Sequence, residues 1–240
     1  MEYYYTNPEN VDKKTNELII KDFEYKHLVK VLRKREGDTI MVTDGRLNLY
    51  TCKIKTIESY VIFCSIIKSD YNLFEPPVNL KLYIAPLRNA SRFEFAIEKA
   101  VELGVKIIQP VITEHTIKEG VFSKSKTERL NKIIIGAMGQ SQRCYLPELK
   151  EVITFESLLK ISEAEKNKTV MYEYSDDTDE TSIDESMKDV SLFIGPEGGF
   201  SESEINELKK NHWKIKSLGR RKLRAETAVI VSIYNVLKNN

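Results

Sequence analysis

The chain has 240 residues, with 37 lysines and arginines against 36 aspartates and glutamates, so its formal net charge is +1. Hydrophobic residues make up 41% and charged residues 30%, a globular composition with room for one large domain or two small ones. No apolar run approaches the roughly 18 residues of a membrane span, and the start lacks a basic region followed by an apolar core. We therefore expect neither a membrane segment nor a secretory signal.

The first 74 residues are predicted to form a β-rich domain. Alternating apolar positions indicate strands over 39–43, 50–57 and 60–67, and one short helix over 27–34 lies before them. The sequence Phe74-Glu75-Pro76-Pro77 follows, and two prolines cannot both join a sheet ladder. We therefore place a domain boundary here, giving domains over 1–74 and 75–240.

The second domain alternates strands with helices. The predicted strands cover 79–85, 105–112, 169–174, 191–194 and 214–218. Four helices are predicted. A capping box at Ser91–Glu94 opens the first, which ends at Gly104, and a capping box at Ser201–Glu204 opens the third. The second covers 127–143 and the fourth covers 225–238. This alternation predicts an α/β fold with a parallel sheet covered by helices.

The three cysteines, Cys52, Cys64 and Cys144, are odd in number and include no CxxC pair. They predict neither a disulfide framework nor a zinc site, and they fit a reducing cytoplasm. We expect a cytoplasmic protein without a metal site.

Charge is unevenly distributed along the chain. Residues 163–189 hold ten acids and three bases, whereas residues 209–224 hold eight bases and no acid. A net charge near zero would argue against a nucleic-acid partner. Because it is the sum of an acidic and a basic segment, it does not exclude one. The basic run either forms a solvated helix face or, because half of it follows a strand, contributes to a ligand site. The acidic stretch 176–189 is predicted to be an exposed loop.

Two loops near the C-terminus are candidates for a binding site. The loop from Gly195 to Phe200 reads GPEGGF, and its glycines allow positive φ and close approach of a ligand to the backbone. It lacks a P-loop lysine, and Glu197 would repel an anion, so we expect a neutral or cationic small molecule. The alternative is an ordinary tight turn.

The second loop, 218–228, reads LGRRKLRAETA and combines an arginine cluster with a carboxylate and a hydroxyl. Glu226 and Thr227 could be first-turn and capping residues of the last helix. Because both loops contain glycine and follow strands, we favour a shared pocket.

The order GPEGGF, then LGxxxLRxETA, resembles the bacterial 16S ribosomal RNA uridine-N3 methyltransferases, which belong to the SPOUT class and use S-adenosylmethionine. The resemblance extends to 27–33 (HLVKVLR), 93–105 (FEFAIEKAVELGV) and 139–143 (GQSQR). It implies an N-terminal PUA-like small β-barrel and a C-terminal SPOUT α/β domain with a trefoil knot over about 169–240. It also implies a homodimer, and the apolar last helix is either a subunit interface or fully buried in a monomer.

The resemblance also implies the site residues. The cofactor pocket would be lined by Tyr172, Glu173, Gly195, Glu197, Gly198, Leu218, Gly219, Leu223, Arg224, Glu226, Thr227 and Ala228. Uridine N3 must lose a proton before methylation, so Glu226 is a candidate base or orienting residue and Arg224 a candidate electrostatic stabiliser. Alternatively both are structural, with Glu226 paired to Arg224 across one helical turn.

The expected partner is 16S ribosomal RNA, either free or in the assembled 30S subunit. Phosphate contacts are expected from Lys30, Arg33, Lys34, Arg35, Arg220 and Arg221. Two alternatives stay open: a SPOUT enzyme acting on another RNA such as transfer RNA, and a non-catalytic RNA-binding protein. A Rossmann-type methyltransferase is disfavoured, because its glycine-rich loop would follow an early strand.

Overall fold

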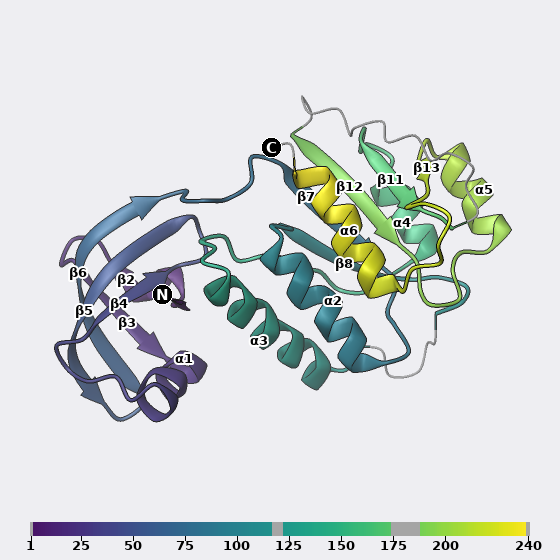
Figure 1. Cartoon of the computed structure of the whole chain (residues 1–240). Coiled ribbons are helices and arrows are strands. Elements are labelled where there is room, and N and C mark those ends of the chain that lie inside the picture. The colour runs from purple at the N-terminus through teal and green to yellow at the C-terminus, as the bar shows by residue number, and fades with distance from the viewer. Residues whose placement is uncertain (1, 117–121, 174–187, 239–240) are drawn as a thin grey trace. The chain divides into compact units, whose positions relative to one another are not determined.

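The computed structural model describes residues 2–116, 122–173 and 188–238, and the chain divides into two compact units (Figure 1). The first unit contains Met1–Glu75 and Ile135–Leu146, and the second contains Pro76–Ile134 and Pro147–Asn240. Most of the predicted acidic loop, 176–187, lies outside the described residues, as does Tyr174 at the predicted strand end.

In its described part, the first unit is built on a curved six-stranded sheet in the order β1–β4–β5–β6–β3–β2 (Figure 1). The strands are β1 (Tyr3–Tyr5), β2 (Val11–Asp12), β3 (Glu17–Lys21), β4 (Thr39–Thr43), β5 (Asn48–Glu58) and β6 (Val61–Tyr71). The β1–β4 pair is parallel and the other pairs are antiparallel. In β5, Cys52 and Ile54 are buried while Lys53 and Lys55 are exposed, so one face of the strand packs on the core.

The first unit has short helical segments before β2 and after β3. A 3-10 turn η1 (Pro8–Asn10) precedes β2, and α1 (Asp22–Lys26) continues into a π-helical turn η2 (His27–Val31). The helical segment thus covers 22–31, so it begins and ends earlier than the predicted helix over 27–34. Leu28 is fully buried in the core, which anchors the turn, and Arg33 has a φ of +54°, which is incompatible with a continuing right-handed helix.

The segment 135–146 belongs to the first unit because of two close contacts. A Cβ at Gly139 would meet the carbonyl oxygen of Tyr3, so only glycine allows this approach. Arg143 and Glu75 form an ion pair at 2.8 Å, with side chains 5% and 1% exposed. Glu75 also accepts hydrogen bonds from the backbone N–H groups of Cys144 and Tyr145, each at 3.0 Å. A buried charge needs this kind of full pairing.

The second unit contains a parallel sheet whose described strands follow the order β10–β8–β7–β12–β11–β13, with β9 paired to β8. The strands are β7 (Asn79–Ile84), β8 (Ile107–Ile112), β9 (Glu148–Leu149), β10 (Ile153–Thr154), β11 (Lys168–Met171), β12 (Asp189–Ile194) and β13 (Lys214–Lys216). β7 and β12 are almost wholly buried, as expected for central strands of a parallel sheet. The predicted α/β class is confirmed.

Helices cover this sheet on both faces (Figure 1). They are α2 (Ala90–Glu102), α3 (Lys124–Gln140, whose last turns belong to the first unit), α4 (Phe155–Ile161), α5 (Glu202–Lys210) and α6 (Ala225–Leu237). From α4 and α5, Leu158, Ile205 and Leu208 join a buried cluster with Tyr83 and Phe193 of the sheet. α6 packs on α2 and β12. Within the described ranges, none of the helices is long and apolar enough to cross a bilayer.

One of the two predicted capping boxes is wrong. α2 is capped by Asn89, whose side chain accepts a hydrogen bond from the N–H of Arg92 at 3.2 Å, and Ser91 lies inside the first turn. Asn is as good an N-cap as Ser, so sequence alone does not choose between them. The second capping box is confirmed, because Ser201 and Glu204 bond each other's backbone N–H groups. Gly104, with a φ of +107°, follows α2 as predicted.

Candidate functional site

A cavity of about 350 Å³ lies in the second unit, at the carboxyl ends of β11, β12 and β13. Ligands of open parallel sheets bind at this edge. The lining residues are Arg92, Met171, Tyr172, Glu173, Ile194, Gly195, Pro196, Glu197, Gly199, Phe200, Ser217, Leu218, Gly219, Arg221, Lys222, Leu223, Arg224, Ala225 and Ala228. The two glycine-bearing loops identified in the sequence therefore do share one pocket.

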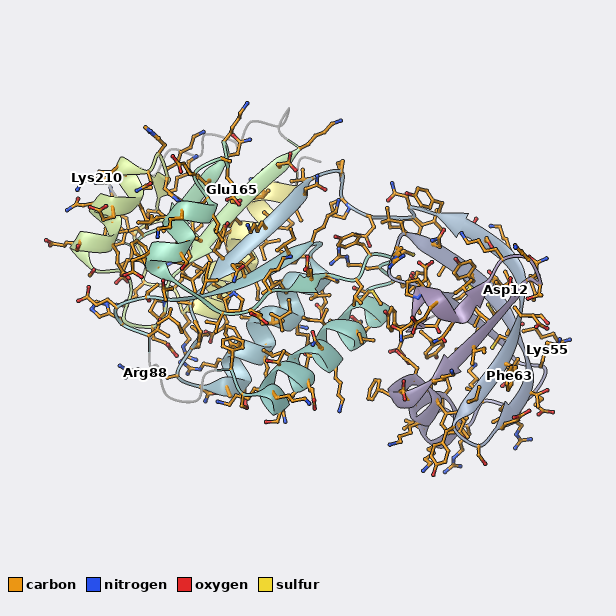
Figure 2. The ribbon with its side chains drawn as sticks, turned by 180° about the vertical axis from the view of Figure 1, so that it is seen from behind. Asp12, Lys55, Phe63, Arg88, Glu165 and Lys210 are labelled. Atoms are coloured by element: carbon orange, nitrogen blue, oxygen red, sulfur yellow. The ribbon has the colours of Figure 1, made fainter. Side chains whose placement is uncertain are left out.

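The GPEGGF loop forms the first wall. Phe200 anchors it, with its ring 4.7 Å from that of Phe193 between centroids. The carboxylate of Glu197 accepts hydrogen bonds from the N–H of Arg88 at 3.1 and 3.2 Å, which ties the loop to the end of β7; Figure 2 labels Arg88 in the loop between β7 and α2. Both Gly195 and Glu197 line the cavity.

Gly198 lies outside the lining of this cavity. A Cβ on Gly198 would approach the Cβ of His115 to 3.0 Å. The His115 ring is fixed in turn, because its Nδ1 lies 3.1 Å from the carbonyl oxygen of Gly199. Since a carbonyl oxygen only accepts, Nδ1 carries the proton of this hydrogen bond. The absence of a side chain at Gly198 thus allows His115 to pack against the loop, on the side away from the cavity lining.

The 217–228 loop forms the second wall. Leu218, Leu223 and Ala228 give the cavity apolar surface. Gly219 has a φ of +101°, and among the described residues beyond its two chain neighbours no atom lies within 4 Å of the position a Cβ would take. The hydroxyl of Ser217 accepts a hydrogen bond from the N–H of Gly219 at 3.3 Å, which stabilises the turn. The open space beside Gly219 is available to a ligand.

Glu226 lies at the first turn of α6, behind the residues that line the cavity. Its side chain is 13% exposed, and its Oε1 lies 3.8 Å from Nε of Arg92, which does line the cavity. Its other oxygen, Oε2, is buried and has no hydrogen-bond partner among the described residues. The neighbouring Thr227 is exposed and does not line the cavity.

Arg92 lines the cavity, comes from neither candidate loop and was missed by the sequence analysis. In the described part of the chain, no ion pair joins Glu226 to Arg224, the pairing offered as an alternative. Arg92 follows the carboxyl end of β7, the edge at which parallel sheets bind ligands. A search for polar residues after the carboxyl end of every predicted strand would therefore have indicated Arg92.

Charged groups surround an apolar interior. Glu173 pairs with Lys222 at 3.2 Å, and Tyr172 and Glu173 line the cavity from the end of β11. The interior is formed by Met171, Ile194 and Phe200 with the leucines of the second wall. Small-molecule sites commonly combine mostly apolar walls with a few polar groups in this way.

The residues predicted to contact RNA are distributed over both units. Arg220 and Arg221 are exposed in the second unit, and Arg221 also lines the cavity. In the first unit, Lys30, Arg33 and Arg35 are exposed at and after η2, and Lys34 is partly buried.

Comparison with known proteins gives consistent results. The model of an RNA methyltransferase domain matches residues 74–237, and the model of an RNA methyltransferase PUA domain matches residues 20–63. The ribosomal RNA small subunit methyltransferase E of Aquifex aeolicus is 29% identical over 95% of this chain and 96% of its own length. That of Bacillus subtilis is 30% identical over 88% and 85%.

A solved structure resembles this one over the whole chain. It is a ribosomal RNA small subunit methyltransferase E from Neisseria gonorrhoeae bound to S-adenosyl methionine, with a TM-score of 0.90 and 28% identity. The match covers 100% of this chain and 98% of that one.

Proposed function

The chain belongs to the RNA methyltransferase family that contains ribosomal RNA small subunit methyltransferase E, and from this premise we propose that it methylates N3 of a specific uridine in 16S ribosomal RNA with S-adenosylmethionine. The observation that carries the proposal is the cavity at the carboxyl ends of β11, β12 and β13, walled by the two loops on which the family resemblance rests. The first unit, which includes the PUA match, would hold the RNA.

The residues of the cavity fit this cofactor. Its volume of about 350 Å³ lies within the roughly 300–1,000 Å³ of small-molecule sites. Leu218, Leu223 and Ala228 offer apolar surface to an adenine ring, and the carboxylates of Glu173 and Glu197 favour a cation. When bound, S-adenosylmethionine supplies a methyl group activated by a sulfonium. The protein's contribution is then to hold the target base in line and to manage its proton.

Glu226 is the proposed acceptor of the N3 proton. Its buried Oε2 has no partner among the described residues, and a buried acceptor in this state gains from a donor such as an N–H group of a bound ligand. Glu226 lies in the first turn of α6, and the guanidinium of Arg92 is 3.8 Å from its Oε1. A carboxylate at this position can remove the proton of uridine N3.

Arg92 and Arg224 are the proposed stabilisers of the anionic base. Both line the cavity, and loss of the N3 proton leaves negative charge on the uracil ring, which a nearby guanidinium stabilises. Arg92 acts in addition on Glu226, which it orients. Gly198 remains in the proposal as a support of the first wall rather than as a lining residue, and Thr227 has no direct role in it.

Further details of the proposal follow from the family. We propose a PUA-like small β-barrel in the first unit and a trefoil knot over about 169–240, in a cytoplasmic homodimer. Support for the dimer comes from α6 and α2, where Tyr234 and Phe95 keep 58% and 42% of their surface exposed. Apolar surface of this kind is available for a second subunit.

The test uses labelled S-adenosylmethionine with three substrates: unmethylated 30S subunits, free 16S RNA and transfer RNA. We expect label in the small-subunit RNA. Label in transfer RNA alone would favour a related enzyme with a different target. Normal cofactor binding without transfer to any of the three would favour a non-catalytic RNA-binding protein.

A further inference from the structure

The first unit contains a cavity of its own, unrelated to the methyl-transfer site. It measures about 590 Å³ and is open on one side. We name it the hairpin groove, and its lining residues are Pro8, Val11, Asp12, Lys13, Lys14, Asp44, Arg46, Asn48 and Tyr50. The turn between β2 and β3 forms one side of the groove, and the turn between β4 and β5 forms the other.

The two acids of the hairpin groove are occupied by donors of the protein itself. Asp12, labelled in Figure 2 on edge strand β2, accepts hydrogen bonds from the N–H groups of Lys14 and Thr15 at 2.8 and 3.3 Å. These backbone hydrogen bonds lower the pKa of Asp12. Asp44 is buried and takes part in three hydrogen bonds, from Arg46 N–H and Asn48 Nδ2 at 2.8 Å and from the Tyr50 hydroxyl at 3.1 Å.

The three bases of the hairpin groove are available to a ligand. Lys13, Lys14 and Arg46 are exposed, and within the described ranges no carboxylate lies at ion-pair distance from any of them. Their backbones are nevertheless fixed. Asp12 holds the turn that carries both lysines, and Arg46 is held by Asp44 and by a β-bridge to Tyr145. Cations therefore face the groove from both sides, on tight turns.

We propose that the hairpin groove binds the phosphodiester backbone of an RNA strand that flanks the target base. This inference rests on the proposed function, which makes RNA the substrate. Three cations along an open groove suit a chain of phosphates, each of which needs one basic contact and no enclosing pocket.

The hairpin groove is separate from the basic segment predicted from the sequence. Lys13 and Lys14 precede β3, whereas Lys30 and Arg33 lie beyond its other end, after α1. β3 has five residues, so its two ends are roughly 13 Å apart. The first unit would thus contact RNA at two places, of which the sequence analysis predicted one.

The test compares RNA binding of two triple variants at several salt concentrations. In the groove variant, Lys13, Lys14 and Arg46 are replaced by alanine. In the control, the exposed bases Lys53, Lys160 and Lys209 are replaced, so that net charge falls equally. For 16S RNA, we expect the groove variant to bind roughly tenfold more weakly, with a salt dependence shallower by about 2 to 3 in log–log slope. The control should bind like the wild type.

Equal affinity and slope for the groove variant and the control would overturn the proposal. A variant that keeps the charges, Lys13→Arg, Lys14→Arg and Arg46→Lys, should bind as the wild type does, and a tenfold loss there would also overturn it. The proposed function fails separately, if the wild-type protein binds RNA but transfers no methyl group to it.

Discussion

Nε of Arg92 lies 3.8 Å from Oε1 of Glu226, so an ion pair joins the first turn of α2 to the first turn of α6 beside the cavity of the second unit. The dipole of α6 favours the carboxylate of Glu226 in its first turn, whereas the dipole of α2 disfavours the cation of Arg92 in its first turn. Arg92 therefore does not stabilise α2 through the helix dipole. We interpret its position by its contact with Glu226 and the cavity.

Replacing Arg92 by glutamine should slow methyl transfer by about 100-fold, the scale of losing one electrostatic stabiliser. Affinity for S-adenosylmethionine should change only a few-fold, because Arg92 acts on the target base and on Glu226. Single-turnover kinetics and calorimetric cofactor binding measure the two quantities. Arg92→Lys, which keeps the charge, should recover part of the rate; equal loss in both variants would count against an electrostatic role.

Replacing Glu226 by glutamine removes the proposed base with little change in shape. We expect methyl transfer to fall by about 100-fold or more, with cofactor affinity near that of the wild type. A variant with full turnover and normal cofactor binding would exclude Glu226 as the base.

Filling the cavity should block the cofactor. Ala228 lines it on α6, and the preceding residue, Thr227, is exposed and outside it. Overpacking costs about 1–3 kcal/mol, so Ala228→Leu should weaken cofactor binding by about tenfold or more. Thr227→Leu serves as the control and should bind normally. If calorimetry gave the two variants equal affinity for S-adenosylmethionine, the cofactor would bind outside this cavity.

The buried pair Arg143–Glu75 should dominate the stability of the first unit. Glu75→Gln leaves Arg143 without its counter-charge and should lower the free energy of unfolding by about 3–5 kcal/mol. Glu17→Gln is the matched control, because Glu17 pairs with Lys55 at the surface and should lose about 1 kcal/mol or less. Hydrogen exchange of the amides in β4 and β5 reports on this unit. Similar losses in both variants would contradict the structural role of the buried pair.

The carboxyl group of Glu24 should make the first unit less stable as pH rises. Burial raises the pKa of Glu24 from 4.5 to about 7, so the stabilising protonated form is present below pH 4.5 and is lost as pH rises to about 7. The loss is roughly 3 kcal/mol. Glu24→Gln keeps an acceptor for the N–H of Tyr5 and should remove this pH dependence. Parallel stability curves for variant and wild type would refute it.

Local patterns predict much of the second unit. Buried parallel strands are continuous apolar runs, and β8 and β12 are recognisable for that reason. The two glycine-bearing loops are equally visible, since positive φ at Gly199 and Gly219 requires glycine or strain. Short elements without a clear period, such as β1, β3 and α4, are missed.

Long-range pairs could not be predicted in this way. The contact of Glu75 with Arg143 assigns 135–146 to the first unit, and that of Arg92 with Glu226 completes the site. In each pair the partners are far apart in the sequence, and neither has a local pattern that distinguishes it from a solvent-exposed charge. Only the assembled fold shows that Glu75 is buried.

Nucleoside mass spectrometry of small-subunit RNA treated with the protein and S-adenosylmethionine tests the proposed reaction directly. We expect N3-methyluridine at a single position, absent when the Glu226→Gln variant is used. A methyl group on another atom or base, or RNA without any added methyl group, would contradict it.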